Sequence, residues 1–247
     1  MFDFKNIPPV VKNLLIINGL FYLSTVVLDQ QGIHLADYLG LHYWGSPGFM
    51  PHQLVTYMFM HGGFTHILFN MFAVWMFGRV LEGVWGQKRF LIFYMVTGIG
   101  AGLIQMLVAH LRLMPLADIL SPEAMDYAIT NGYDLMRGGK GPAEFVTNPY
   151  FVDALLLINT STVGASGAVF GILLAFGMLF PNTELMLLFP PIPIKAKWFV
   201  LGYGVIELYS GFANNPHDNV AHFAHLGGML FGFILIRMWK RDRGNFF

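Results

Sequence analysis

The sequence contains no cysteine, and only 11% of its 247 residues are charged. Disulfides and thiolate metal sites are therefore excluded, although the absence of cysteine does not reveal the redox compartment. Acidic and basic residues balance to a net charge of zero, and the one basic cluster is the short segment 240–243. A basic surface is what nucleic acid would require, so we expect no nucleic-acid partner. Internal repeats are also absent, which favours one domain over residues 1–247.

Hydrophobic residues, by contrast, make up 55% of the chain, and the mean hydropathy is +0.57. This composition lies outside the range of soluble globular proteins and indicates an integral membrane protein. Crossing a ~30 Å hydrocarbon core takes about 20 apolar residues, so we expect an all-α polytopic fold with six membrane helices. The first run lacks a small-residue cleavage site after it, which favours a retained helix over a signal peptide. The six helices are predicted at residues 10–28, 63–77, 90–110, 163–180, 196–212 and 220–239.

Three of these runs, the second, fourth and fifth, are short for a full span, and we expect them to end within the membrane or to begin below its surface. The segment 111–159 is too polar to cross the bilayer and is predicted to be an outer loop. In this loop, Ser121, Pro122 and Glu123 match the N-cap, first-turn proline and acidic residue that begin a helix.

Lysine and arginine are concentrated on one side of the predicted bundle. Eleven of the 14 lie around the start of the first run, between the second and third runs, around the start of the fifth run, or at the end of the sixth run and beyond it. Cytoplasmic flanks carry this excess, so both termini are predicted to be cytoplasmic. We expect a multi-pass protein of a cell membrane, the bacterial inner membrane.

Polar side chains inside the second predicted helix indicate a possible site. His66 and Asn70 are four residues apart and therefore lie on one helix face. Two hydrogen-bond donors held side by side could stabilise an oxyanion. The alternative is that both residues join helices through neutral hydrogen bonds. His61 and His222 lie near the outer ends of helices, where contact with water or lipid headgroups would explain them.

Ser166 and His225 each lie in a glycine-spaced helix. Small residues at this spacing let two helices pack backbone to backbone, which could bring Ser166 Oγ within reach of His225. That geometry is the one of a base-activated nucleophile. A packing serine that bonds back to the preceding turn is the alternative. The glycines concerned are Gly164, Gly167, Gly171, Gly228 and Gly232.

Glu207, in the fifth predicted helix, leaves two interpretations open. Its carboxylate could orient the imidazole as the third member of a triad. We favour the other interpretation, in which a protonated Glu207 bonds to a neighbouring helix.

Three motifs occur in order along the chain: HGGFTHILFN at 61–70, GASG at 164–167 and AHLGGMLFG at 224–232. Together they resemble the rhomboid family of intramembrane serine proteases, over about Pro51 to Met238. The resemblance implies a six-helix bundle in which Ser166 is the nucleophile and His225 the general base, without a catalytic carboxylate. It also implies that His66, Asn70 and the Ser166 N–H form an oxyanion hole.

The resemblance further implies that the fourth helix begins at the serine, below a water-filled cavity open to the outside. The fifth helix and the segment 211–219 would form a lateral gate. Two positions depart from the family pattern. Trp44 is followed by Gly45 where many members have arginine, and Phe170 replaces a tyrosine that stacks on the histidine in many bacterial members. Neither change removes a catalytic atom.

The leading hypothesis is therefore an endopeptidase that cleaves transmembrane protein substrates near the outer membrane face and needs neither metal nor cofactor. One alternative is a catalytically silent rhomboid-like scaffold that binds membrane proteins. A second is a transporter or metal site built on imidazoles, which suit zinc and similar ions. The histidines available for it are His61, His66, His222 and His225.

Overall fold

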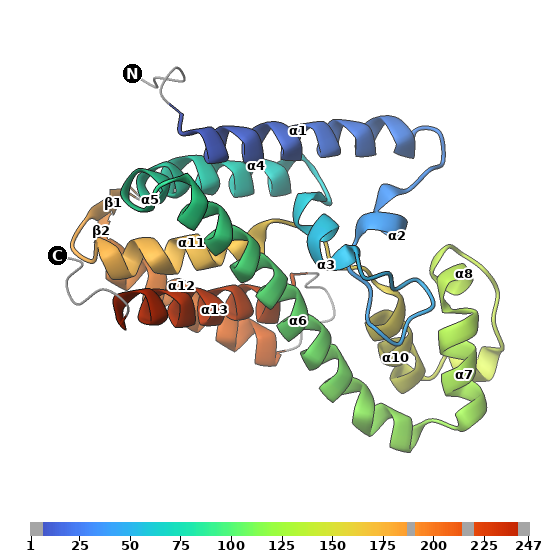
Figure 1. The fold of residues 1–247 in the computed structure, drawn as a ribbon. Helices are drawn as coiled ribbons and strands as arrows, with labels where there is room; N and C mark the ends of the chain where they lie inside the picture. Colours follow the sequence, from blue (N-terminus) through green and yellow to red (C-terminus); the bar gives the residue numbers. More distant parts are fainter. Residues whose placement is uncertain (1–6, 187–190, 214–219, 242–247) are drawn as a thin grey trace.

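The computed structural model describes residues 7–186, 191–213 and 220–241. The described chain is mostly helical, and its long helices form a bundle with a smaller helical cluster at the C-terminal end of one of them (Figure 1). The long elements are α1 (Pro9–Asp29), α4 (Phe64–Ala73) continued by η3 (Val74–Gly78) and α5 (Arg79–Trp85), α6 (Gln87–Ile119), α11 (Ser166–Leu179), α12 (Ala196–Ala213) and α13 (His222–Arg241).

Among the described residues, three helical segments are long and apolar enough to cross a bilayer: Pro9–Asp29, Phe64–Trp85 and Gln87–Ile119. The expectation that the second run ends at residue 77 is wrong, because the helix continues through a π-helical turn to Trp85. Polar residues within that last part find partners, with Arg79 over the ring of Trp75 and Glu82 buried. The fourth run is short as predicted, since α11 has 14 residues.

Glu82 is buried because it caps another helix. Its two carboxylate oxygens accept hydrogen bonds from the backbone N–H groups of Val10, at 3.0 Å, and Val11, at 2.8 Å. These are N–H groups of the first turn of α1, which have no partner within their own helix. The carboxylate also lies at the positive end of the helix dipole. An acidic residue of α5 thus fixes the start of α1.

The segment 111–159, predicted to be an outer loop, is mostly helical. The third helix does not end at residue 110 as predicted but continues to Ile119, with Pro115 inside it. The continuation is amphipathic enough to bury Leu113 and Leu116 against a separate small core with Phe151. The prediction of a helix after Ser121 is confirmed, because Ser121 Oγ accepts a hydrogen bond from Ala124 N at 3.2 Å. The helices here are α7 (Pro122–Thr130), α8 (Gly132–Met136), α9 (Ala143–Val146) and α10 (Pro149–Asn159).

The connection between α1 and α4 is organised by Gln53, which is fully buried. Its side-chain amide donates to the carbonyl of Gly48 at 2.9 Å and accepts from Met50 N at 3.1 Å. Tyr43 anchors the same connection to α6 through its hydroxyl, 2.8 Å from His110 Nδ1. The short elements here are α2 (Leu35–Leu39), α3 (Gln53–Thr56) and η2 (Tyr57–Phe59).

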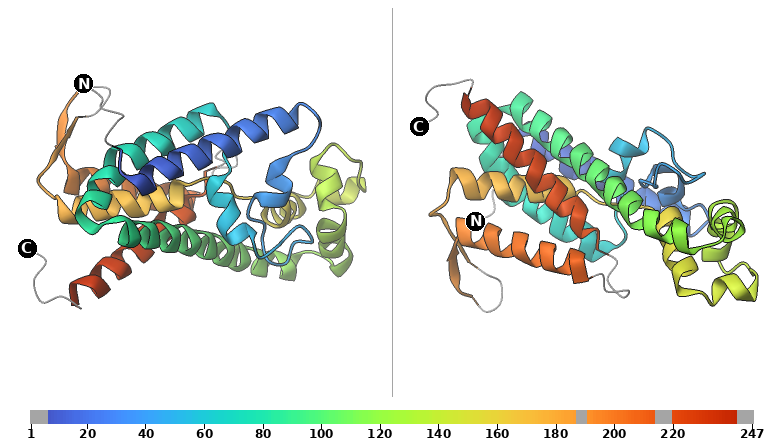
Figure 2. Two further views of the ribbon diagram at one scale, coloured as in Figure 1. Left: turned by 45° about the horizontal axis from the view of Figure 1, so that its top comes forward. Right: turned by 90° about the horizontal axis from the view of Figure 1, so that it is seen from below.

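The centre of the bundle is formed by α6, α11 and α13, which lie side by side (Figure 2). In contrast, α12 lies at the periphery and buries only Ala196, Val200, Glu207 and Gly211. It follows an antiparallel pair of short strands, β1 (Glu184–Met186) and β2 (Pro193–Lys195). The charged residue on the buried side of α12 is therefore Glu207.

Candidate active site

Ser166 is the first residue of α11, and the chain leading to it is fixed from outside the helix. The N–H of Gly164 donates to the carbonyl of Tyr57 at 2.9 Å, and Thr162 pairs with Leu41 in a short β-bridge. Gly164 has a φ of 128°, a backbone conformation that residues with a Cβ rarely adopt. The Tyr57 carbonyl is a contact that no side-chain pattern in the sequence indicates.

Ser166 and His225 are in hydrogen-bond contact. The distance between Ser166 Oγ and His225 Nε2 is 2.8 Å, although 59 residues separate them in the chain. His225 lies in the first turn of α13 and is only 8% exposed. The ring of Phe170 stacks on the imidazole, with centroids 4.2 Å apart and planes at 8°. The ring of Phe170 thus fixes the plane of the His225 imidazole, and Nε2 stays in contact with the Ser166 hydroxyl.

Glycines allow the close approach of α11 and α13 that this contact needs. A Cβ on Gly228 would lie 1.8 Å from the carbonyl oxygen of Gly167, so the two backbones touch. Gly232 likewise faces the Cα of Gly171, at 3.4 Å from its own Cβ position. Gly167 and Gly171 were expected to admit the helix that carries His225, and their backbones do lie against it, but their missing side chains make room mainly for α6. A Cβ on either would first meet α6, at Ala101 or Thr97, because three helices converge here.

His66 and Asn70 lie on the same face of α4, near the serine. A Cβ on Gly164 would be 2.7 Å from His66 Nε2 and 3.7 Å from Ser166 Oγ, so the glycine lies between these two side chains. His66 Nδ1 accepts a long hydrogen bond from Gly62 N, at 3.4 Å, which leaves Nε2 as the donor. The buried Nδ2 of Asn70 has no hydrogen-bond partner among the described residues. Two donors of α4 are therefore available to a ligand.

His61 lies in the turn before α4 and is buried, with its ring edge-on to His66 at 5.1 Å. The expectation that it faces water or headgroups is wrong, because η2 and α4 fold the turn inward. Burial, and secondarily the neighbouring His66, lowers the pKa of His61 to about 4. The His61 ring is therefore neutral near pH 7.

Glu207 contacts two histidines of α13. Its Oε2 lies 2.6 Å from Nδ1 of His222 and 2.9 Å from Nδ1 of His225. All three side chains are nearly buried, at 9%, 12% and 10% exposure for Glu207, His222 and His225. The expectation that His222 faces water or headgroups is therefore wrong, because its ring faces the carboxylate of Glu207. Carboxylate and imidazole are also zinc-binding groups, and these three residues place their ligand atoms within 4.8 Å of one another. The metal site considered as an alternative used four histidines, and only His222 and His225 of those belong to this cluster.

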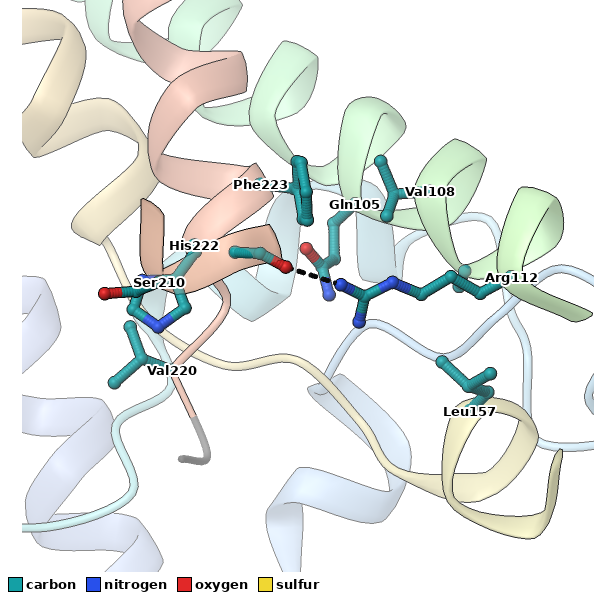
Figure 3. A pocket seen from close by; sticks show the side chains of 10 residues that line it. Gln105, Val108, Arg112, Leu157, Ser210, Val220, His222 and Phe223 are labelled. Carbon is teal, nitrogen blue, oxygen red and sulfur yellow. Dashed lines mark hydrogen bonds between the residues drawn. The ribbon is translucent and has the colours of Figure 1, made fainter. Parts of the chain in front are cut away.

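A small polar pocket opens beside His222, between α6, α10, α12 and α13 (Figure 3). Arg112, from the outer part of α6, reaches across it and donates to the carbonyl of Gly211 at 2.7 Å. The guanidinium also lies over the ring of Phe223, 5.3 Å from its centroid. Because Gly211 is in the last turn of α12, Arg112 holds the outer end of that helix. The segment 214–219, part of the expected lateral gate, lies outside the described residues.

Comparison with known proteins gives a match to the family model described as "Rhomboid domain", over residues 49–118 and 143–241. The gap between the two matched parts covers α7 and α8 of the outer cluster. Rhomboid-like protein 11, chloroplastic, of Arabidopsis thaliana is 26% identical over 250 residues, covering 89% of this chain and 64% of the relative. The putative rhomboid protease YdcA of Bacillus subtilis is 27% identical over 194 residues, covering 77% of this chain and 69% of the relative.

A third relative, RHOMBOID-like protein 12, mitochondrial, of Arabidopsis thaliana, is 26% identical and covers 95% of this chain and 58% of its own length. The chain thus spans about three fifths of the length of these two plant relatives. The relatives come from mitochondria and chloroplasts as well as from a bacterium. The comparisons agree with a membrane protein and give no support to the bacterial inner membrane in particular.

Proposed function

The chain belongs to the rhomboid family, and on this premise we propose that it is a serine endopeptidase that cleaves transmembrane protein substrates near the outer membrane face. The observation that carries the proposal is the 2.8 Å contact between Ser166 Oγ and His225 Nε2 at the start of α11. A hydroxyl paired with an imidazole at this distance is the arrangement of an activated nucleophile. Two relatives from Bacillus subtilis have names that state this activity: the putative rhomboid protease YdcA and the rhomboid protease GluP.

The mechanism proceeds from the hydrogen bond. Ser166 Oγ attacks the substrate carbonyl while its proton passes to His225 Nε2. The negative charge that develops on the carbonyl oxygen is stabilised by the side chains of His66 and Asn70 and by the N–H of Ser166. His225 then protonates the leaving amine, and an acyl-enzyme remains on Ser166. Water then attacks the acyl carbon while His225 takes one of its protons. As the bond from that carbon to Ser166 Oγ breaks, His225 returns the proton to Oγ and the new carboxyl group is released.

The membrane arrangement is part of the same proposal. We infer six spans in a single domain, with both termini on the cytoplasmic side. The short α11 leaves Ser166 about 5–8 Å below the outer surface at 1.5 Å per residue, where water can reach it. Buried polar groups in a bilayer are costly, and a site at this depth limits that cost.

Replacement of the serine tests the function. Wild-type protein in liposomes should cleave a model transmembrane substrate and should be labelled by a fluorophosphonate. The Ser166→Ala variant should do neither and should keep the wild-type melting midpoint. Cleavage by the alanine variant would contradict the assignment of the nucleophile.

A catalytically silent scaffold is the competing function, and the relatives named only "rhomboid-like" are the observation that favours it. It predicts that the protein retains a membrane partner with and without Ser166 and that fluorophosphonate labels neither form. Labelling that is lost in a His225→Ala variant would exclude it.

A further inference from the structure

We propose that Glu207 is a positioning residue that makes the serine–histidine pair a triad. Its carboxylate faces the Nδ1 proton of His225 and holds the imidazole with Nε2 toward Ser166. The inference rests on the proposed protease function and adds a third group to it. The family resemblance implies a pair without a carboxylate, so a third group departs from what the resemblance implies.

The three side chains form a continuous line of polar atoms. Glu207 Oε2 lies 2.9 Å from His225 Nδ1, and His225 Nε2 lies 2.8 Å from Ser166 Oγ. If Nε2 is to accept the serine proton, the neutral ring must carry its own proton on Nδ1, the nitrogen that faces the carboxylate. The Nδ1–H direction is off the line to Oε2, so in this structure the two atoms make a close polar contact rather than an aligned hydrogen bond.

The position of the carboxylate is fixed from two sides. His222 lies three residues before His225 on the same face of α13, and its Nδ1 is 2.6 Å from the same oxygen. Arg112 holds the last turn of α12 through the carbonyl of Gly211. Glu207 is thus supported by its own helix and by a second imidazole.

A purely structural role would need only part of this geometry. A bond to His222 alone would join α12 to α13 and satisfy the buried carboxylate. The second contact, with His225, connects the carboxylate to the serine. When Ser166 loses its proton to Nε2, the Oγ–H bond breaks and an Nε2–H bond forms. The resulting imidazolium then lies beside a carboxylate that keeps its charge and takes up no proton.

The size of the effect follows from comparison with soluble triads. Replacing the triad carboxylate by an amide there lowers kcat by about 10⁴, but Phe170 stacks on His225 and also holds the ring here, so we expect a fall of about 10- to 100-fold. Substrate binding does not involve Glu207 in this scheme. KM should therefore stay within about twofold of the wild-type value.

The experiment compares wild type, Glu207→Gln and Ser166→Ala in liposomes with a fluorescent model transmembrane substrate. The matched control is Glu184→Gln, which removes an exposed carboxylate of β1 and should leave kcat unchanged. Rates are normalised to the folded fraction, and the rate of fluorophosphonate labelling of Ser166 provides a readout that needs no substrate. A chelator should change none of these rates, because the carboxylate acts on the imidazole directly.

The expected result is a lower kcat and slower labelling in Glu207→Gln at nearly constant KM. A wild-type kcat in that variant, a loss confined to KM and melting midpoint, or activity that a chelator abolishes would overturn the inference. If Glu207→Gln does not fold, Glu207→Asp replaces it. Its shorter side chain withdraws the carboxylate from Nδ1, so kcat should also fall, and an unchanged kcat would overturn the inference.

Ser166→Ala separates the two proposals. Cleavage by this variant, or none by the wild type, would overturn the proposed function and the role of Glu207 with it. Cleavage that depends on Ser166 but is undiminished in Glu207→Gln would overturn the role of Glu207 alone.

Discussion

At the scale of single residues, His61 is one group through which pH should act on stability. The sequence places it next to a helix, but its burial depends on how η2 and α4 fold the turn, which residue spacing does not specify. The Ser166 and His225 pair, by contrast, could be predicted, because glycine spacing and motif order are properties of the sequence. For Glu207, the sequence left the contact with His225 as one of two interpretations and did not indicate the contact with His222, because both contacts depend on the rotation of α12.

The folded protein should lose stability in mild acid because of His61. Its pKa is lowered to about 4, whereas the unfolded chain has the ordinary value of about 6.5, so between these values only the unfolded state is protonated. Stability is fully present above pH 6.5 and falls as the pH drops toward 4. The loss from this residue between pH 7.5 and pH 5 should be about 2 kcal/mol.

Melting midpoints of wild type and His61→Gln at the two pH values measure this contribution. The glutamine variant should show a smaller fall in midpoint than the wild type. Equal falls in both proteins would show that other groups cause the acid sensitivity.

At the scale of elements, α1 depends on a cap from outside itself. Glu82→Ala leaves two N–H groups of the first turn unpaired, and hydrogen bonds to a charged group contribute about 1.5–3 kcal/mol each. We expect a loss of about 2–4 kcal/mol, measured by unfolding in mixed detergent micelles. Glu82→Gln, which keeps one acceptor, should lose less. Two variants as stable as the wild type would mean that α1 is held by packing alone.

Hydropathy predicts the end of a helix correctly only where the apolar run and the helix end at the same residue. The second helix passes residue 77 because Arg79 and Glu82 have partners, and a hydropathy pattern does not reveal partners. The third helix continues to Ile119 because its outer part packs on α7 and α10. Both boundaries were set by tertiary contacts rather than by composition.

At the scale of the whole molecule, the charge distribution predicts which ends of the bundle face the cytoplasm. Lys88 is exposed at the first turn of α6, and Lys140 is exposed in the outer cluster beyond its other end. The absence of native cysteine makes single-cysteine variants free of background. In intact cells, an impermeant maleimide should label Lys140→Cys and not Lys88→Cys.

Membrane permeabilisation is the control for this experiment, because it should make both variants react. Labelling of Lys88→Cys alone before permeabilisation would reverse the proposed orientation. Labelling of both would place the two ends of α6 on the same side and contradict the predicted span.

The cap on α1 also bears on biosynthesis. Val11 and Glu82 are 71 residues apart, so α1 is translated before the residue that caps its first turn. Nascent chains arrested before Glu82 should therefore hold α1 with its first amides exposed to solvent or to the insertion machinery. The start of the first helix is then completed only once the second long helix is being made, although the first helix is translated earlier.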